Sequence, residues 1–469
     1  MSISYEIIPK KVPKVNTKYR KIVTEIPPKE SIPILKKLRR YEPRSMTGQP
    51  LVVWDKASGF QVYDKFGNRW IDFSSGVLVA NAGHGAQEIK KAIINQVKKG
   101  LLHNYCFPSE LRVKLTEKLI KISPKELNKV FLLTTGAETV ENVIKLARTY
   151  GIKHTHAVGG GKKKIGIISF KGSFHGRTLG AQMVGGITHL KEWIVNLDPD
   201  MHVVPFPNCF RCPWGKEEYE NCDNECFENF LKYFRENSIY PERTAAMLTE
   251  TFQGGGATFF PRGVIRALVN YCRKNEILVI FDEVQAAFGR TGKMFGFEHY
   301  GIVPDLVCLG KGITSSLPLS AVIGKSKIMD IYNPNEMTST HTGNPVCIAA
   351  SIANIDTIIR KKLVNHASTV GEVLRKELEK LHEKYSDIIG VVQGRGLVYG
   401  IHIVKPGSKD PDNLLASKIV GKAVEKGLLF FAPVGFGEGT IKASPPLTIT
   451  EDAIRDGIHA LTEAIKESI

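Results

Sequence analysis

Six short apolar runs, separated by longer stretches with helical periodicity, constrain the fold of this chain more than any other feature of its sequence. They lie in the part of the chain that begins at about residue 90. Each run has the length of a strand, and the segments between them are long enough for helices. Strands that alternate with helices form a mainly parallel sheet covered by helices, so an α/β fold is expected. The runs read KVFLL, KIGIISF, AAMLTE, ILVIFDE, DLVCLGK and LSAVIGK.

The sequence on either side of this layer has a different character. Residues 1–45 are rich in Lys and Pro without clear periodicity, which predicts an N-terminal arm rather than a core element. Residues 46–90 read as short strands joined by turns, with DKFGN as a hairpin signal, and form the N-terminal part of a small domain. Residues 91–347 make up the large domain, and residues 348–469 return to the small one.

The last hundred residues predict a smaller α+β domain. An amphipathic helix is expected near 364–384, followed by the strand-like segment GVVQGRGLVYGIHIV. A final helix places four apolar residues on one face: Ile454, Ile458, Leu461 and Ile465. No internal repeat or low-complexity tract is visible in the sequence.

Composition narrows the functional classes. The chain has 469 residues, 42% of them hydrophobic, which is enough for a large domain and a smaller one. No apolar run reaches membrane-spanning length and the N-terminus lacks the apolar core of a signal peptide, so a cytoplasmic location is expected. The 64 Lys and Arg exceed the 47 Asp and Glu by 17. Such an excess indicates a solvated basic surface, although it would also attract anionic ligands or nucleic acid.

Four of the eight cysteines are clustered in CFRCPWGKEEYENCDNEC, within a polar insertion at about residues 207–228. Cys209, Cys212, Cys222 and Cys226 have a spacing compatible with a four-thiolate zinc or iron–sulfur site. The alternative is a surface insertion that holds reduced thiols or one or two disulfides.

Ligands bind beyond the carboxyl ends of the strands in an open α/β sheet, so the residues after each strand are candidates for a site. Gly136 and Ala137 open a helix after KVFLLT, where free backbone N–H groups can hold a phosphate, although tight packing also selects such residues. Phe174 and His175 follow KIGIISF in a Gly-flanked turn. The aromatic ring there would either stack on a planar ligand or belong to a partly buried loop.

Two further strand ends carry charge. Lys311 follows DLVCLG, and a lysine removed from water there can form a Schiff base, whereas a structural lysine would pair with a carboxylate or reach solvent. Asp282 and Glu283 lie at the end of the buried run ILVIFDE. If they have no role in binding a ligand, they merely cap a turn. Pyridoxal phosphate requires an anchor for its phosphate, support for its ring, a partner for its pyridine nitrogen and a Schiff-base amine. The strand ends together offer these four features.

The segments that carry these features resemble the class III, or ω-amino acid, aminotransferases, in particular 4-aminobutyrate aminotransferase-like proteins. The resemblance extends from about residue 46 to the C-terminus and depends on the joint order of the motifs. It implies a fold-type I pyridoxal-phosphate-dependent transferase, with a mainly parallel large domain and a smaller α+β domain. The motifs are TTGAETVENVIKLAR, GSFHGRT, IFDEVQAAFGRTGKMFGFEHYGIVPDLVCLGKG, PLSAVIGK and THTGNPVCIAA.

The resemblance also assigns roles to residues. Lys311 would form the Schiff base and then move the proton on the substrate carbon. Asp282 would face the pyridine nitrogen and keep it protonated, and Gln285 would lie beside the 3-hydroxyl of the cofactor. The phosphate would be bound by Gly136 and Ala137.

The remaining assignments concern the rest of the site and the partner chain. Phe174 and His175 complete the residues expected to bind the cofactor. Thr340, in THTGNP, would reach the phosphate across a dimer interface, which implies a homodimer with shared active sites. Glu283 would hold the local loop.

The substrate segments depart from the family pattern. Many family members have QGEGG, whose Glu pairs with the arginine of a C-terminal IRxxPPL that binds the α-carboxylate of glutamate or 2-oxoglutarate. Gly255 and Lys442 occupy these two positions here, and a lysine offers charge without the planar fork of arginine. Alternatively, Lys442 lies on the surface and another arginine binds the carboxylate. Val77 and Glu250 complete the substrate-binding residues that we predict.

The predicted function is transfer of an amino group to a 2-oxo acid, either 2-oxoglutarate or pyruvate. The expected donors are ω-amino acids, diamines and β-amino acid derivatives, and the net charge of +17 admits a CoA thioester. A racemase or lyase of the same family is the alternative among enzymes, because it uses the same lysine. A nucleic-acid-binding or regulatory protein would explain the charge but not Asp282, Gln285 and Lys311 at family spacing, and no DNA-binding module is evident.

Overall fold

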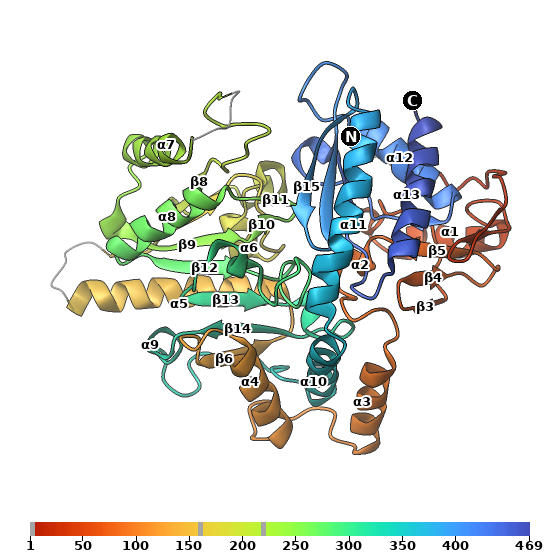
Figure 1. Cartoon of the computed structure of the whole chain (residues 1–469). Coiled ribbons are helices and arrows are strands. Elements are labelled where there is room, and N and C mark those ends of the chain that lie inside the picture. Colours follow the sequence, from red (N-terminus) through yellow and green to blue (C-terminus); the bar gives the residue numbers. More distant parts are fainter. Residues whose placement is uncertain (1–4, 158–162, 217–221) are drawn as a thin grey trace.

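A seven-stranded sheet forms the centre of the larger part of the molecule (Figure 1). The computed structural model describes residues 5–157, 163–216 and 222–469. Residues 1–4 of the predicted arm and residues 217–221 of the predicted insertion lie outside this description. The strand order is β6-β14-β13-β12-β9-β7-β8, and every pairing is parallel except the two made by β14. The strands are β6 (Lys129–Leu133), β7 (Gly166–Phe170), β8 (Met201–Val204), β9 (Thr244–Glu250), β12 (Leu278–Asp282), β13 (Leu306–Leu309) and β14 (Ser320–Gly324).

Both faces of this sheet are covered, which explains the unbroken apolar runs in the sequence. Leu278 and Ile280 of β12 pack into the cluster that contains the apolar face of α5 (Gly136–Ala157), whereas Val279 and Phe281 pack into the cluster that contains α8 (Arg262–Lys274). Successive side chains of a strand point to opposite faces, so a sheet covered on both faces needs apolar residues at every position. The mainly parallel α/β sheet predicted from the sequence is thereby confirmed.

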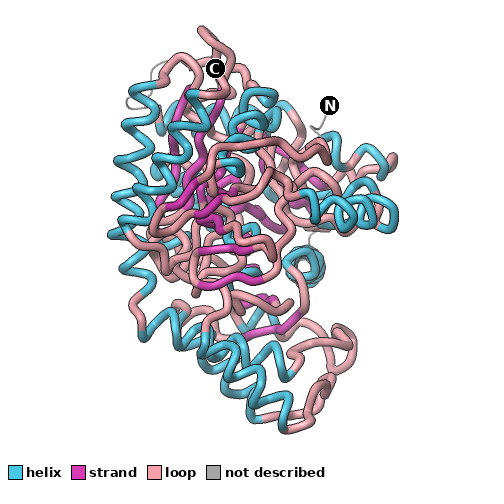
Figure 2. The backbone as a smooth tube through the Cα atoms, turned by 90° about the vertical axis from the view of Figure 1, so that its right-hand side faces the viewer, coloured by secondary structure: helices cyan, strands magenta, loops and turns pink. Residues whose placement is uncertain are grey.

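The remaining helices surround the sheets, and Figure 2 shows the strands in the interior with helices along the outside. The helix predicted near 364–384 is α11, and the four apolar residues predicted on the face of the last helix are all buried in α13. The further helices are α1 (Ile32–Tyr41), α2 (Ser75–Leu78), α3 (Gln87–Lys98), α4 (Glu110–Ile122), α6 (Leu179–Val184), α7 (Asp223–Glu236), α9 (Ser326–Met329), α10 (Pro345–Arg360), α11 (Leu363–Lys384), α12 (Asn413–Glu425) and α13 (Glu451–Lys466).

The smaller sheets combine segments from both ends of the chain. One sheet has the order β1-β2-β5-β4-β3, and β17 of the C-terminal region joins it by pairing in parallel with β5. The predicted DKFGN hairpin connects β4 to β5. A three-stranded sheet, β15-β16-β18, and the pair β10-β11 complete the structure. The strands are β1 (Val15–Asn16), β2 (Lys21–Ile22), β3 (Lys56–Ser58), β4 (Gln61–Tyr63), β5 (Arg69–Asp72), β10 (Phe252–Gln253), β11 (Thr258–Phe259), β15 (Ile389–Arg395), β16 (Val398–Ile403), β17 (Leu428–Leu429) and β18 (Thr440–Ala443).

The N-terminal segment differs from the expected arm. Its strand β2 pairs with β5, and Ile22 is fully buried in a cluster with Trp70. The guanidinium of Arg20 donates to Asp456 of α13 (2.7 Å) and to the carbonyl of Lys426 (2.8 Å). The prediction that residues 1–45 contribute no core element was therefore wrong for these residues. Their sequence lacks periodicity because they pack through isolated side chains rather than through a helix face.

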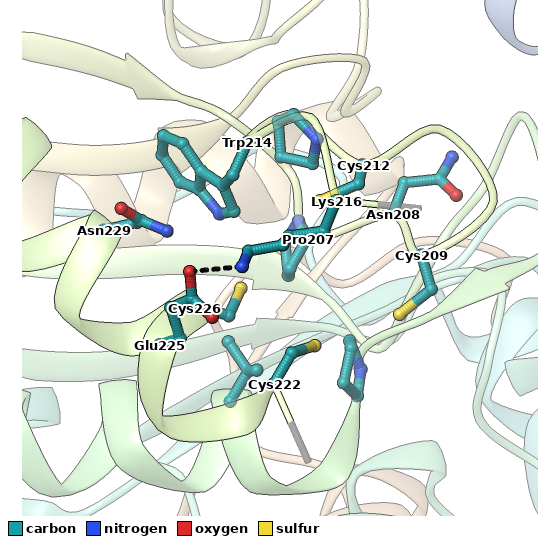
Figure 3. Close-up of a pocket in the computed structure, with 13 residues that line it drawn as sticks. Pro207, Asn208, Cys209, Cys212, Trp214, Lys216, Cys222, Glu225, Cys226 and Asn229 are labelled. Atoms are coloured by element: carbon teal, nitrogen blue, oxygen red, sulfur yellow. Dashed lines mark ion pairs between the residues drawn. The ribbon is translucent and has the colours of Figure 1, made fainter. Parts of the chain in front are cut away.

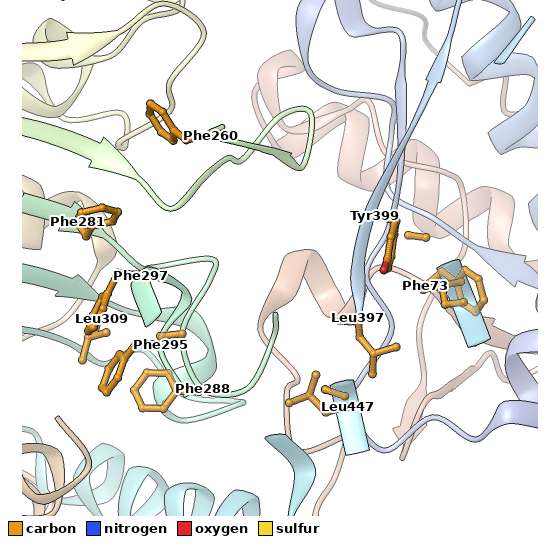
Figure 4. Packing of buried hydrophobic residues seen from close by; sticks show 14 of the residues in the cluster. Phe73, Phe260, Phe281, Phe288, Phe295, Phe297, Leu309, Leu397, Tyr399 and Leu447 are labelled. Carbon is orange, nitrogen blue, oxygen red and sulfur yellow. The ribbon is translucent and has the colours of Figure 1, made fainter. Parts of the chain in front are cut away.

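A continuous core joins the large sheet to the smaller sheets. Figure 4 shows Phe281 and Phe297 beside the large sheet and Leu397 and Tyr399 beside β16, and all four belong to one buried cluster. Arg290 is fully buried between these parts, where it donates to the carbonyls of Leu397 (3.0 Å) and Pro445 (2.5 Å). The two parts of the molecule are therefore held by buried contacts. Their exact division into domains stays a prediction.

Among the helices in the described part of the chain, we find none with the length and apolar character that crossing a membrane requires.

Candidate active site

A cavity of about 170 Å³ lies beyond the carboxyl ends of the parallel strands. Since a water molecule occupies about 30 Å³ of liquid, the cavity has room for a ring-sized ligand. Eight residues predicted from the sequence line it: Gly136, Ala137, Phe174, His175, Glu250, Asp282, Gln285 and Lys311. The expectation that different strand ends converge on one site is thereby confirmed. Four further residues line the cavity that the sequence analysis did not single out: Gly176, Phe252, Val284 and Ala286.

The N-terminus of α5 forms one side of the cavity. The first N–H groups of a helix have no acceptor within it and attract anions. A Cβ atom added to Gly136 would lie 3.0 Å from Cγ1 of Val284, so a larger residue would press on that side chain. Glu138 accepts the N–H groups of Thr134 (2.9 Å) and Thr135 (2.6 Å), which fixes the turn before the helix. The geometry suits a phosphate at this end of the cavity.

A buried polar cluster forms another part of the cavity lining. Nδ1 of His175 donates to Oδ2 of Asp282 (2.8 Å), and the backbone N–H of Val284 donates to Oδ1 (3.1 Å). Both side chains are almost completely buried. Burial lowers the pKa of His175, but the hydrogen bond to Asp282 and the charges of Asp282 and Glu250 outweigh it, and the pKa is raised. The carboxylate of Asp282 is therefore held in one orientation beside a protonatable imidazole.

Glu250, at the end of β9, adds a second carboxyl group to this cluster. Its oxygens accept the backbone N–H groups of Gly254 (3.0 Å) and Phe174 (3.3 Å). Burial raises the pKa of Glu250 to about 7, and the charge of His175 partly opposes this shift. A carboxyl group with such a pKa can hold a proton near neutral pH.

Lys311 follows β13 and projects into the same cavity. Removal from water lowers the pKa of Lys311 to about 8, although the charges of Asp282 and Glu250 act in the opposite direction. A lysine with a lowered pKa is neutral in a larger fraction of molecules, and the neutral amine is the nucleophilic form. Lys311 also has a left-handed backbone conformation (φ +42°), which L residues rarely adopt.

Glu283 has a structural position, as expected. Its carboxylate accepts the backbone N–H groups of Gly296 (2.6 Å) and Phe297 (2.9 Å) and the hydroxyl of Thr251. Burial raises the pKa of Glu283 to about 7. Because its acceptor sites are used by the turn at Gly296–Tyr300, Glu283 holds the loop that follows Asp282.

Lys442 of β18 is buried, with 3% of its surface exposed, so the alternative that it is a surface residue was wrong. Its Nζ donates to Oε1 of Gln285 (2.8 Å) and to the carbonyl of Gly254, and it lies 5.6 Å from the ring centroid of Phe431. Burial lowers the pKa of Lys442 to about 7, helped by the charge of Lys311. The predicted substrate lysine therefore lies directly behind Gln285 at the cavity wall.

Gly255 is held close to another segment of backbone. A Cβ atom added at this position would lie 2.8 Å from Cα of Gly435 and 3.1 Å from its nitrogen. Backbone atoms cannot rotate away as a side chain can, so the loop at Gly435 would have to move. A side chain at this position, where many members of the resembled family have Glu, would therefore require the backbone at Gly435 to shift.

Four predicted residues are not part of the cavity lining: Gly255 and Lys442, described above, and Val77 and Thr340. Val77 is exposed and has φ +63° within α2, and its substrate role stays a prediction. Thr340 is exposed in the segment before α10, and the single chain does not test its predicted contact across a dimer interface.

Among the residues that sequence reasoning missed, Val284 and Phe252 have the clearest signals. Val284 lies between Asp282 and Gln285 at the same strand end, so its neighbours in the sequence could have identified it. It also packs against Gly136 and Gly310 across the cavity wall. Phe252 follows Glu250 by two residues and is buried against Ala286.

The residues in the cavity fit pyridoxal phosphate. The helix N-terminus offers N–H groups for a phosphate, and Phe174 and Val284 supply apolar walls for a ring. Asp282 offers a buried carboxylate to a protonated ring nitrogen, and Lys311 offers an amine of lowered pKa. Nε2 of His175 is buried and has no hydrogen-bond partner among the described residues. It is therefore available to a polar atom of a bound ligand.

Comparisons with known proteins agree with this geometry. Residues 43–465 match the family described as aminotransferase class III. The chain is 33% identical over 440 residues to a leucine/methionine racemase of Thermococcus litoralis, with 92% of this chain and 95% of the relative covered. It is 32% identical to a 4-aminobutyrate aminotransferase of Mycobacterium leprae, with 95% and 98% covered. An amine transaminase from an uncultivated Pseudomonas species, solved with pyridoxal phosphate bound, gives a TM-score of 0.82 at 27% identity and covers 89% of this chain and 95% of its own.

Proposed function

The chain belongs to the class III aminotransferases, a family of pyridoxal-phosphate-dependent enzymes, and we propose that it takes the amino group from an amine on a terminal or β/γ carbon and delivers it to a 2-oxo acid. The donor class comprises ω-amino acids, diamines and β-amino acid derivatives, including CoA thioesters. The acceptor is 2-oxoglutarate or pyruvate.

The residues of the cavity have complementary parts in this reaction. Bound pyridoxal phosphate supplies an electrophilic carbonyl group and a ring that withdraws electrons from the substrate carbon. Lys311 would hold the cofactor through its amine, and its Nζ would accept the proton from the substrate carbon that bears the amine. Asp282, oriented by His175, would favour a protonated ring nitrogen. Gly136 and Ala137 would bind the phosphate, and Phe174 would lie against the ring.

One observation carries the proposed donor class, namely the replacement of the family's Glu–Arg pair by Gly255 and a buried Lys442. The ammonium of Lys442 already donates to Gln285 and to the carbonyl of Gly254. It can attract a substrate carboxylate, but it lacks the two parallel donors that recognise a carboxylate in a planar fork. A donor whose carboxylate is distant from its amine, or absent, therefore suits this wall better than an α-amino acid.

A screen of single turnovers tests the proposal. The holoenzyme is mixed with each amine in the absence of an acceptor, and the loss of the cofactor's visible absorbance is followed. We expect rapid conversion with 4-aminobutyrate, longer ω-amino acids and diamines, and slower conversion with glutamate. Rapid conversion with glutamate alone would contradict the proposed donor class.

Racemisation of an α-amino acid is a second candidate function, favoured by the similarity to the Thermococcus litoralis racemase. The same lysine would remove the α-proton, and the carbanion would be protonated again on the opposite face. Incubation of L-leucine or L-methionine with the holoenzyme in D₂O, without a 2-oxo acid, separates the two functions. A racemase forms the deuterated D-enantiomer and leaves the cofactor unchanged. A transaminase transfers the amino group to the cofactor and stops after one half-reaction, because no 2-oxo acid is present to accept the group.

We also propose a homodimer whose active sites are shared. The segments near Leu102 and Thr340 lie side by side, because Asn344 donates to the carbonyl of Leu102 (2.7 Å) and Tyr105 donates to Thr338 (3.0 Å). Three exposed apolar side chains belong to the same region: Leu101, Leu102 and Phe107. Burial of this surface between two copies would place Thr340 at the interface. Light scattering of the holoenzyme, with cofactor affinity measured for Thr340→Ala, tests this arrangement.

A further inference from the structure

Four cysteine side chains line a second pocket, separate from the active-site cavity (Figure 3). Cys209 and Cys212 lie in the segment after β8, Cys222 immediately precedes α7, and Cys226 lies in the first turn of that helix. The backbone N–H of Cys226 donates to the carbonyl of Cys222 (2.7 Å), and residues four apart lie on the same face of a helical turn. The fold therefore brings two pairs of thiols from two segments to one pocket.

The pocket is small and has apolar walls. Its volume is about 20 Å³, and its other lining residues include Pro207, Trp214, Pro261 and Val264. A cavity needs about 10–15 Å³ of such volume to hold one water molecule. The space is therefore sufficient for a single ion.

The indole of Trp214 brings an N–H group to the wall of the same pocket. Nε1 of Trp214 is buried without any hydrogen bond of ordinary geometry within the described residues. An N–H group close to sulfur stabilises a thiolate once it forms.

Lys216 and Glu225 of α7 also line the pocket and form an ion pair with each other (2.8 Å), so together they add no net charge to it.

The thiols need some rearrangement to surround a metal ion. Among the described residues, no three Cys, His, Asp or Glu side chains are already arranged around a position for a metal ion. The four cysteines nevertheless line one pocket, and rotation about the Cα–Cβ bond between staggered rotamers moves a sulfur without moving the backbone.

We propose that Cys209, Cys212, Cys222 and Cys226 bind one zinc ion as thiolates, with release of their thiol protons. Soft thiolate ligands select zinc over magnesium or calcium, and four thiolates with tetrahedral geometry are typical of structural zinc sites. The cysteine cluster is thereby a mononuclear site that stabilises the fold, rather than part of the catalytic cavity.

The zinc ion would fix a contact between the two parts of the molecule. Between Cys209 and Cys212, the ring of Phe210 lies 6.3 Å from that of His402, and Nε of Arg211 donates to the carbonyl of Lys409 (2.7 Å). Nε2 of His402 in turn lies 2.9 Å from the carbonyl oxygen of Gly256, the residue that follows Gly255. Loss of the ion should therefore loosen this contact and lower the thermal midpoint of unfolding.

Metal analysis of the purified full-length holoenzyme tests the site. The protein is produced in medium supplemented with both zinc and iron, and we expect about one zinc per chain. In the double variant Cys209→Ser/Cys212→Ser, the zinc content should fall at least about tenfold. Cys222→His should retain zinc, because imidazole nitrogen also binds zinc. Cys106→Ser, which changes an exposed cysteine outside the cluster, should retain the full content.

Cobalt substitution provides a readout that does not depend on the serine variants. Cobalt(II) bound to four thiolates gives intense visible ligand-field bands together with sulfur-to-metal charge transfer. These bands should appear in the wild-type protein, and they decide the question even if the double variant fails to fold. Less than about a tenth of a metal ion per chain would overturn the proposal, as would zinc retained by a folded double variant. One iron per chain in place of zinc would overturn the choice of metal.

Discussion

Replacement of Lys442 by methionine should remove the attraction that we propose between its ammonium and the carboxylate of a donor. Methionine has a similar length and is uncharged, so it keeps most of the buried volume while removing the ammonium. The carbonyl of Gly254 and Oε1 of Gln285 lose a donor in this variant. Circular dichroism and the thermal midpoint verify that the variant is folded.

The expected size follows from the kind of contact that is lost. A hydrogen bond to a charged group contributes about 1.5–3 kcal/mol, which corresponds to about 10- to 150-fold in kcat/KM. We therefore expect kcat/KM for 4-aminobutyrate, divided by that for butylamine, to fall by about that factor in Lys442→Met. The two donors share the reacting amine, so effects on Lys311 and on the cofactor cancel in the ratio.

The same ratio should depend on pH in the wild-type enzyme. Burial lowers the pKa of Lys442 to about 7, so its ammonium predominates below pH 7 and is lost as the pH rises. The preference for 4-aminobutyrate should be constant at low pH and fall by up to about tenfold per pH unit above 7. In Lys442→Met, the ratio should no longer change with pH.

Lys164 provides a matched control, since it is also buried but donates to the carbonyls of Asn275 (2.7 Å) and Glu276 (2.9 Å), neither of which lines the cavity, whereas Lys442 donates to the lining residue Gln285. Lys164→Met should leave the ratio unchanged. The reasoning fails if the wild-type ratio and the Lys442→Met ratio agree at pH 6, or if Lys164→Met lowers the ratio as much.

Three other predictions concern single residues. Lys311→Ala should abolish amino transfer while the protein stays folded, and borohydride reduction of the wild-type holoenzyme followed by peptide mapping should label Lys311 and no other lysine. Asp282→Asn should lower kcat at least about tenfold with the cofactor still bound, and NMR titration should show a lower pKa for His175, because the hydrogen bond and charge that raise it are lost. Gly255→Ala should lower the free energy of unfolding by about 1–3 kcal/mol in denaturant titrations, because its Cβ would lie 2.8 Å from Cα of Gly435; an unchanged midpoint would show that the Gly435 loop moves freely.

The residues that we propose to bind the cofactor were predictable because each follows a recognisable strand. The carboxyl ends of parallel strands meet at one edge of a sheet, so Asp282 and Lys311 had to come together once their strands were identified. Phe174 and Gly136 follow from the same rule, applied to β7 and β6. The antiparallel direction of β14 was not predictable, because the sequence of a strand buried on both faces does not reveal its direction.

The tertiary contacts of Lys442 and Gly255 were not predictable in the same way. Lys442 contacts the carbonyl of a residue that precedes it by 188 positions, and nothing in its own segment indicates whether it is buried. The contact between Gly255 and Gly435 is equally distant in sequence. Arg20 was assigned to an arm, because its two partners near the C-terminus are visible only in the folded chain.

The sequence by itself determined the α/β class, the strand ends that supply Asp282 and Lys311, and the presence of four closely spaced cysteines. These features depend on local periodicity and on the spacing of residues within one segment. The tertiary structure decided that Lys442 is buried behind Gln285, that Gly255 lies against the backbone of Gly435, and that the cysteines share one pocket. Burial and steric exclusion arise when distant segments pack together, and they therefore have no signature within a single segment of sequence.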